Sequence, residues 1–95
     1  MVTVLWDIRV KSEAAAEGRA LIQRIWRDME HFAGYVSHRL LQEEDEAGHF
    51  VVVSEWESRA VADAIREQYA QAEPVRLLTP FLAAPRIRWV LSEAS

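Results

Sequence analysis

The chain has 95 residues, of which 51% are hydrophobic and 27% are charged, with no cysteine and a formal net charge of -4. This size and balance are typical of one globular domain, residues 1–95, and exclude a disordered or fibrous protein. The lack of cysteine excludes disulfides, thiolate nucleophiles and cysteine metal sites, and the acidic charge disfavours nucleic-acid binding.

A chain this short builds only a thin core, and it must accommodate four tryptophans. Association with a second copy would bury the surplus apolar surface. The amino terminus has no basic region, and its apolar character is interrupted by Asp7 and Arg9, so we expect no signal peptide. No apolar run approaches the ~20 residues that span a bilayer. The sequence therefore predicts a cytoplasmic protein with no membrane partner.

The first predicted element is a strand, because polarity alternates from Thr3 to Lys11. One face would carry Val4, Trp6, Ile8 and Val10. A helix follows, with Ser12 as its N-cap and Gly34 as its stop. Gly18 lies on its apolar stripe, where it would let the helix approach the sheet closely. The stripe consists of Ala14, Leu21, Ile22, Ile25, Met29 and Phe32, with Trp26 beside it.

Two strands joined by an acidic turn, residues 44–48, form a predicted hairpin of Tyr35–Glu43 and His49–Trp56. The second of these strands is apolar on both of its faces, which is typical of a strand buried on both sides. One face carries Phe50, Val52 and Trp56, and the other carries Val51 and Val53.

A second helix begins at Ser58, its predicted N-cap, and is expected to end at Pro74. Its predicted apolar stripe consists of Val61, Ala64, Ile65, Gln68 and Tyr69. Residues 75–82 are expected to form a short helical turn or a packed loop. The last strand, Arg86–Leu91, places Ile87, Trp89 and Leu91 on one side.

The resulting order β-α-β-β-α-β predicts an α+β fold, a ferredoxin-like sandwich with an antiparallel four-stranded sheet. Right-handed crossovers put both helices on one face of the sheet, with the first and third strands in the centre. Because the other face is also apolar, we expect a homodimer that forms through this open sheet face.

The sequence resembles the antibiotic biosynthesis monooxygenase (ABM) family of dimeric α/β barrels. The resemblance rests on Phe32-Ala33-Gly34-Tyr35, on the acidic turn and above all on Glu55-Trp56-Glu57-Ser58. It implies a homodimer with a small cavity between sheet and helices in each subunit. It also implies a monooxygenase that oxidises an apolar aromatic, polyketide-like molecule with oxygen and uses no metal, flavin or haem cofactor.

The family resemblance assigns two catalytic residues. Trp56 matches a tryptophan that lines the family's cavity, and Arg76, twenty positions further on (76 − 56 = 20), matches an arginine that would stabilise a substrate anion. The substrate pocket is expected to be lined by Val52, Ala62, Ile65 and Tyr69. Two of these depart from the family, which places an asparagine at the position of Val52 and a tyrosine at that of Ala62.

Other functions stay open. Trp56 also suits a core position and Arg76 a surface position, so a non-catalytic ligand-binding, regulatory or dimerisation protein is the alternative. A haem-degrading branch of the fold is disfavoured because Asp7, Ile65 and Val75 occupy its characteristic positions. The segment 48–51 only faintly resembles an RNA-binding motif, and a metallochaperone would need cysteines.

The remaining charged groups are predicted to be structural. Asp7 interrupts an apolar strand, and we expect it to pair with Arg9, Arg86 or Arg88 on the dimer side. The three histidines have no ligand spacing, and the acidic turn does not have the spacing of a calcium loop, so we expect no metal site.

Overall fold

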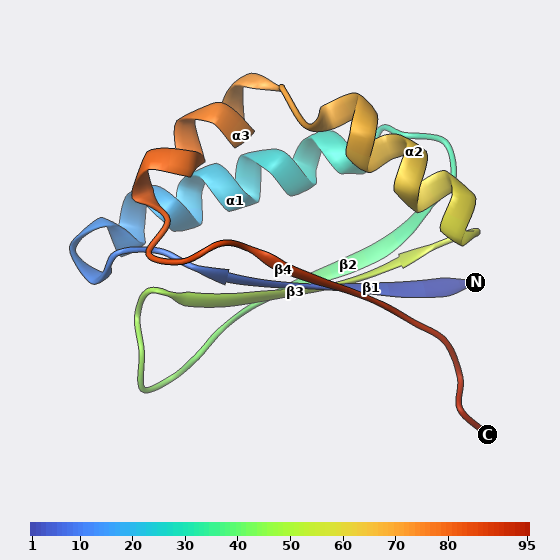
Figure 1. Ribbon diagram of the computed structural model, residues 1–95, viewed down its shortest axis with the longest axis horizontal. Coiled ribbons are helices and arrows are strands. Elements are labelled where there is room, and N and C mark those ends of the chain that lie inside the picture. Colours follow the sequence, from blue (N-terminus) through green and yellow to red (C-terminus); the bar gives the residue numbers. More distant parts are fainter.

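The computed structural model describes residues 1–95 and has the predicted β-α-β-β-α-β order. Its sheet is antiparallel, with strand order β2-β3-β1-β4, which confirms the ferredoxin-like fold. Figure 1 shows the helices together on one side of the sheet, with the other side uncovered. None of the helices is long and apolar enough to cross a membrane. The elements are β1 (Val2–Arg9), α1 (Ala15–Met29), β2 (Tyr35–Gln42), β3 (His49–Trp56), α2 (Arg59–Tyr69), α3 (Glu73–Leu78) and β4 (Ile87–Leu91), with short 3-10 turns at Ser12–Ala14 and Thr79–Phe81.

The start of α1 differs from the prediction. Ser12 is not an N-cap, because it opens a 3-10 turn whose first hydrogen bond runs from the Ala14 N–H to the Lys11 carbonyl, 2.8 Å away. No side chain caps the helix that follows. The expectation for Gly18 is confirmed, since a Cβ there would lie 3.0 Å from both methyl groups of Val10. This close approach seats α1 on β1.

The second helix is rotated slightly from its predicted orientation. Ser58 caps it as expected, with its Oγ accepting a hydrogen bond from the Val61 N–H at 3.2 Å. The buried residues of α2 are Ala62, Ile65 and Tyr69, whereas the predicted stripe residues Ala64 and Gln68 are exposed. The spacing of three and then four residues keeps the buried side chains on one face.

Pro74 does not end α2, as the sequence suggested. The helix ends at Tyr69, and Pro74 lies in the first turn of α3, where its missing N–H has no helical partner to lose. The region 75–82 contains the expected short helical segment. Before β2, Gly34 has φ of +96°, and a Cβ there would collide with the Val61 side chain, so this turn needs glycine.

The uncovered face of the sheet carries a group of exposed and half-buried apolar side chains. Ile87, Trp89 and Leu91 share one side of β4, as predicted, but that side faces away from the helices. Trp89 is 48% exposed, and Leu41 of β2 adds to the same face. Half-buried Leu5, Val51 and Val53 lie between them on the central strands.

One end of this open face carries a charged cluster around His49. Its Nε2 and Nδ1 lie 2.7 Å from carboxylate oxygens of Asp7 and Glu43, respectively. Two carboxylate partners require an N–H on both ring nitrogens, so the imidazole is held as the cation. The hydrogen bond to Glu43, followed by the one to Asp7, raises the pKa of His49 despite the opposing effects of burial and Arg9.

The predicted partners of Asp7 were therefore mostly wrong. His49 is its close partner, Arg9 approaches only to 4.0 Å, and Arg86 and Arg88 lie on the helix-covered side of the sheet. Side chains alternate between the two faces along β4. Because Ile87 and Trp89 face the open side, Arg86 and Arg88 face the helices.

The His49 cluster predicts a pH-dependent contribution to stability. Because the folded-state pKa is raised, this contribution is complete below the ordinary histidine pKa of about 6.5 and is lost as pH rises through the higher folded-state value. Urea unfolding at fixed protein concentration between about pH 6 and 9 should show wild type losing more stability than His49→Gln. The exposed His31→Gln variant is the control, and parallel wild-type and His49→Gln curves would contradict the prediction.

Candidate functional site

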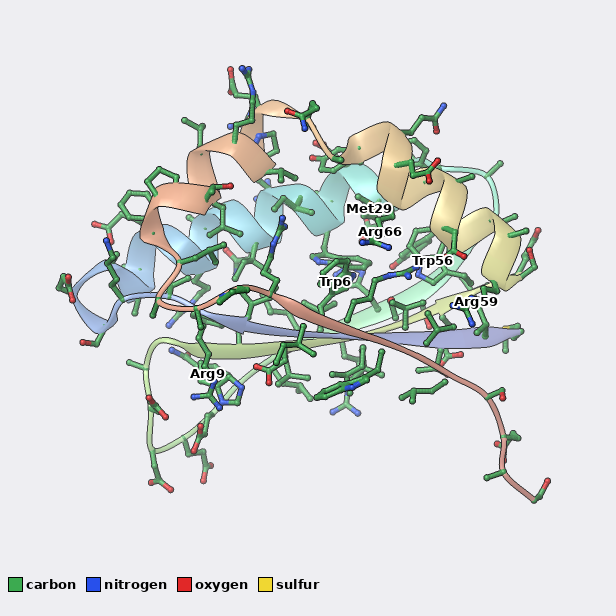
Figure 2. All side chains as sticks on the ribbon, viewed as in Figure 1. Trp6, Arg9, Met29, Trp56, Arg59 and Arg66 are labelled. Carbon is green, nitrogen blue, oxygen red and sulfur yellow. The ribbon has the colours of Figure 1, made fainter.

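A cavity of about 470 Å³ lies between the sheet and the helices. Fifteen of its 20 lining residues are hydrophobic, and its volume is within the roughly 300–1,000 Å³ typical of small-molecule sites. Figure 2 shows Trp6, Met29, Trp56 and Arg66 on the helix side of the sheet, with Arg9 on the opposite side. The lining is formed by Val4, Trp6, Ile8, Ile22, Ile25, Trp26, Met29, Trp56, Ala62, Ile65, Arg66, Tyr69, Ala70, Val75, Leu78, Thr79, Leu82, Pro85, Arg86 and Arg88.

Four residues singled out from the sequence meet at this cavity, namely Trp56, Ala62, Ile65 and Tyr69. Val52 does not reach it. It is completely buried in the centre of β3, with β1 and β2 on either side, and belongs to the core instead.

Arg76 also lies outside the cavity. It is exposed in the last turn of α3, whose buried side is formed by Pro74, Val75 and Leu78. Helical geometry therefore directs its guanidinium outward, although its distance along the sequence from Trp56 matches the family pattern.

Trp56 forms an apolar wall of the cavity. Its indole N–H donates to the Ser54 Oγ at 3.0 Å, and that hydroxyl donates to the Val4 carbonyl at 2.9 Å. Trp26 and Tyr35 pack against the indole, with ring centroids 6.3 and 5.6 Å away. Because its only polar hydrogen is already engaged, Trp56 offers a ligand its ring rather than a hydrogen bond.

Tyr69 similarly presents its ring. Its hydroxyl donates to the Asp28 carboxylate at 2.6 Å, and Asp28 is not part of the lining. Burial, followed by this hydrogen bond and the negative charge of Asp28, raises the pKa of Tyr69 far above its usual value. The phenol therefore stays protonated and is unsuited to act as a base.

Three arginines supply the cationic groups of the cavity, and none of them was predicted to line it. They are Arg66 from α2 and Arg86 and Arg88 from the β4 region. Arg88 lies opposite Trp6 in the β1–β4 register. The guanidinium carbons of Arg86 and Arg88 lie 5.6 and 5.9 Å from the Trp6 ring, within cation–π range.

Arg88 is held in a fixed position, and one of its buried donor atoms has no partner. Its Nη2 donates to the Asp63 carboxylate at 2.8 Å, and this guanidinium is the main reason that the pKa of Asp63 is lowered. The Arg88 side chain is only 11% exposed, and its Nε is buried without a hydrogen-bond partner. A buried N–H without an acceptor is costly, so the protein leaves one polar group of this cavity-lining residue unsatisfied.

The register of β4 is the signal that could have identified these arginines. Once Ile87 and Trp89 are assigned to the open face, alternation requires Arg86 and Arg88 to face the helices. Arg66 follows Ile65 on α2 and is not distinguished by the apolar pattern alone.

The protein has a ferredoxin-like α+β fold with a largely apolar cavity, lined by three arginines, between its sheet and its helices. The model of the family "Antibiotic biosynthesis monooxygenase" matches residues 1–73, so the chain belongs to this ABM family. No curated protein matches the sequence.

Solved structures agree with this assignment at the level of the fold. A candidate antibiotic biosynthesis monooxygenase from Nitrosomonas europaea has a TM-score of 0.87 and 17% identity, with 100% of both chains covered. Rv0793 from Mycobacterium tuberculosis has a TM-score of 0.82 and 24% sequence identity, and the match covers 99% of this chain and 98% of that one. SnoaB from Streptomyces nogalater is described as a cofactor-independent oxygenase. It has a TM-score of 0.80 and 23% sequence identity, and the match covers 99% of this chain and 93% of that one. At these sequence identities the similarity establishes the fold but not the activity.

The assignment of Tyr69 predicts that Tyr69→Phe affects stability rather than ligand binding. Loss of the hydrogen bond to exposed Asp28 should lower the free energy of unfolding by about 1 kcal/mol. Urea denaturation followed by circular dichroism measures this change. Affinity for an aromatic ligand, measured by tryptophan fluorescence, should stay within about twofold, and a much larger loss of affinity would place the hydroxyl in the binding site after all.

Proposed function

We propose that this protein is a cofactor-independent monooxygenase that oxidises an apolar aromatic, polyketide-like phenol or enol. The observation that carries the proposal is the combination of an aromatic cavity with three arginine side chains and no Asp, Glu or His in the lining. Family membership and the fold shared with SnoaB, an oxygenase by description, support the same reading.

The charge distribution of the cavity suits a substrate that reacts as an anion. Arginine is always protonated near neutral pH, so it lowers the pKa of a bound phenol or enol. With no carboxylate or imidazole available as a base, the substrate proton would leave to solvent. The resulting electron-rich anion can reduce oxygen directly, and the cavity contributes orientation and charge stabilisation.

The proposed reaction balances for an anthrone. The ring methylene loses two hydrogens and gains one oxygen atom to become a carbonyl group, and the second oxygen atom leaves as water. The substrate supplies all four electrons that reduce dioxygen, so the reaction needs no external reductant.

In this proposal Arg88 takes the role that the sequence pattern gave to Arg76. Its Nε is the buried donor without a partner, and Asp63 fixes its guanidinium. Trp56 and Trp6 form the walls against which an aromatic ring would stack.

A non-catalytic ligand-binding protein is the alternative. It is favoured by the engagement of the Trp56 N–H and the Tyr69 hydroxyl within the protein, which leaves few polar groups to direct a reaction. The presence of Val52 and Ala62, where the family has an asparagine and a tyrosine, also favours a non-catalytic protein.

Oxygen uptake by metal-free protein with a panel of anthrones and naphthols tests the proposal. Wild type should exceed the background rate, and Arg88→Lys, which keeps the charge but loses the Nε donor, should lower the turnover rate about 100-fold. Arg76→Lys is the matched control and should retain wild-type turnover. No uptake above background with any substrate would favour the ligand-binding alternative, and a loss confined to Arg76→Lys would return the role to Arg76.

We also propose that the protein forms a homodimer through the open sheet face. Exposed Leu41 on β2 and exposed Trp89 on β4 lie at opposite edges of this face, with half-buried apolar residues of the two central strands between them. The helices leave this face bare. Large apolar side chains gathered on one face of a sheet are normally covered in solution. A second copy supplies an identical sheet for it to pack against.

Light scattering at micromolar concentration should show a dimer, and Trp89→Glu should convert it to a monomer by placing a charge in the interface. Leu77→Glu is the matched control, because Leu77 is 46% exposed on α3, away from the sheet, against 48% for Trp89. A monomeric wild type, or a dimer that tolerates Trp89→Glu as well as Leu77→Glu, would contradict this interface.

A further inference from the structure

The cavity has a distinct mouth and a distinct floor. Most of its lining is buried, but four lining residues are exposed and mark where it opens to solvent. These are Arg66 and Ala70 on α2, Thr79 after α3 and Pro85 before β4. Arg86 follows directly and is half-buried. The mouth is therefore cationic, whereas the floor is formed by apolar side chains such as Ile22 and Trp56.

Arg66 and Arg86 form a cation pair without a counter-ion. Neither takes part in an ion pair or a side-chain hydrogen bond, in contrast to Arg24, Arg59 and Arg88. They are close enough that the charge of Arg66, together with the larger effect of burial, lowers the pKa of Arg86. The half-buried guanidinium of Arg86 and the exposed one of Arg66 repel each other, and an anion between them would remove that repulsion.

We propose that Arg66 and Arg86 bind a carboxylate carried by the aromatic ligand, at the mouth of the cavity. This inference deepens the proposed function, on which it rests for the identity of the ligand as a substrate. A carboxylate matches the planar fork of a guanidinium, and two such forks can hold its two oxygens. The ligand is then an aromatic acid whose ring system enters first.

The carboxylate site is separate from the group assigned to the reacting oxygen. Arg88 already has Asp63 as its counter-ion, whereas Arg66 and Arg86 have no counter-ion in the protein. The Trp6 ring lies against both Arg86 and Arg88 and so connects the two sites. An anionic group at the mouth would orient the ring system along this indole, with its far end toward Trp56 (Figure 2).

Isothermal titration with 2-naphthoate and the uncharged 2-naphthamide at neutral pH tests the site without requiring catalysis. Wild type should bind naphthoate at least about tenfold more tightly than the amide. Arg66→Gln and Arg86→Gln should each weaken naphthoate binding about tenfold while changing amide binding less than about twofold. Arg27→Gln, at an exposed arginine outside the cavity, is the control and should bind both compounds as wild type does.

Thermal unfolding of the free variants distinguishes a binding role from a structural one. Because Arg66→Gln removes a like charge near Arg86, it should not lower the melting temperature, even though it weakens naphthoate binding. The proposal is overturned if naphthoate does not bind, if wild type does not prefer it to the amide, or if the variants weaken both compounds equally.

These outcomes are independent of those of the oxygen-uptake experiment. Arginine-dependent binding of naphthoate by a protein that consumes no oxygen with any substrate would keep the carboxylate site and discard the oxygenase. Oxygen uptake with neutral phenols by a protein that shows no preference for naphthoate would do the reverse.

Discussion

The structure depends on a mismatch between a sheet with two apolar faces and helices that cover only one of them. Alternation along β3 buries Phe50, Val52 and Trp56 beneath the helices and leaves Val51 and Val53 on the far side. The short crossovers place α1, α2 and α3 on the same face (Figure 1). The covered face encloses the cavity, and the uncovered one is the surface available to a second copy.

The β4 strand links these two faces. Its alternation directs Arg86 and Arg88 toward the cavity and Ile87 and Trp89 toward the open face. A shift of one residue in its pairing with β1 would reverse every side chain, placing the cations in the dimer surface and apolar groups at the cavity mouth. An interface that fixes the register of this edge strand therefore also fixes the positions of the arginines, so dimerisation and ligand binding share one structural requirement.

The fold could be predicted from the sequence because hydrophobic alternation and the two turns are local signals. The cavity walls at Trp56, Ala62, Ile65 and Tyr69 followed from the family resemblance. Arg86 and Arg88 were missed because the alternation of β4 was not assigned to the two faces of the sheet. Arg66 was missed because spacing along the sequence does not give the rotation of its helix. Arg76 was misassigned for the same reason as Arg66, because α3 buries Val75 and Leu78 and turns Arg76 to solvent. The partner of Asp7 was missed for a related reason, since His49 reaches it only through the β1–β3 pairing.

The distribution of polar groups determines which chemistry the cavity can support. Tyr69 and Trp56 each give their polar hydrogen to another protein group, so the charged groups that the lining offers a ligand are its arginines. Permanent cations favour the anionic form of a ligand but cannot remove its proton. Selection among aromatic compounds would therefore rest on the acidity of the compound as well as on its shape, and a weakly acidic ring system of the right size would bind in an unreactive form.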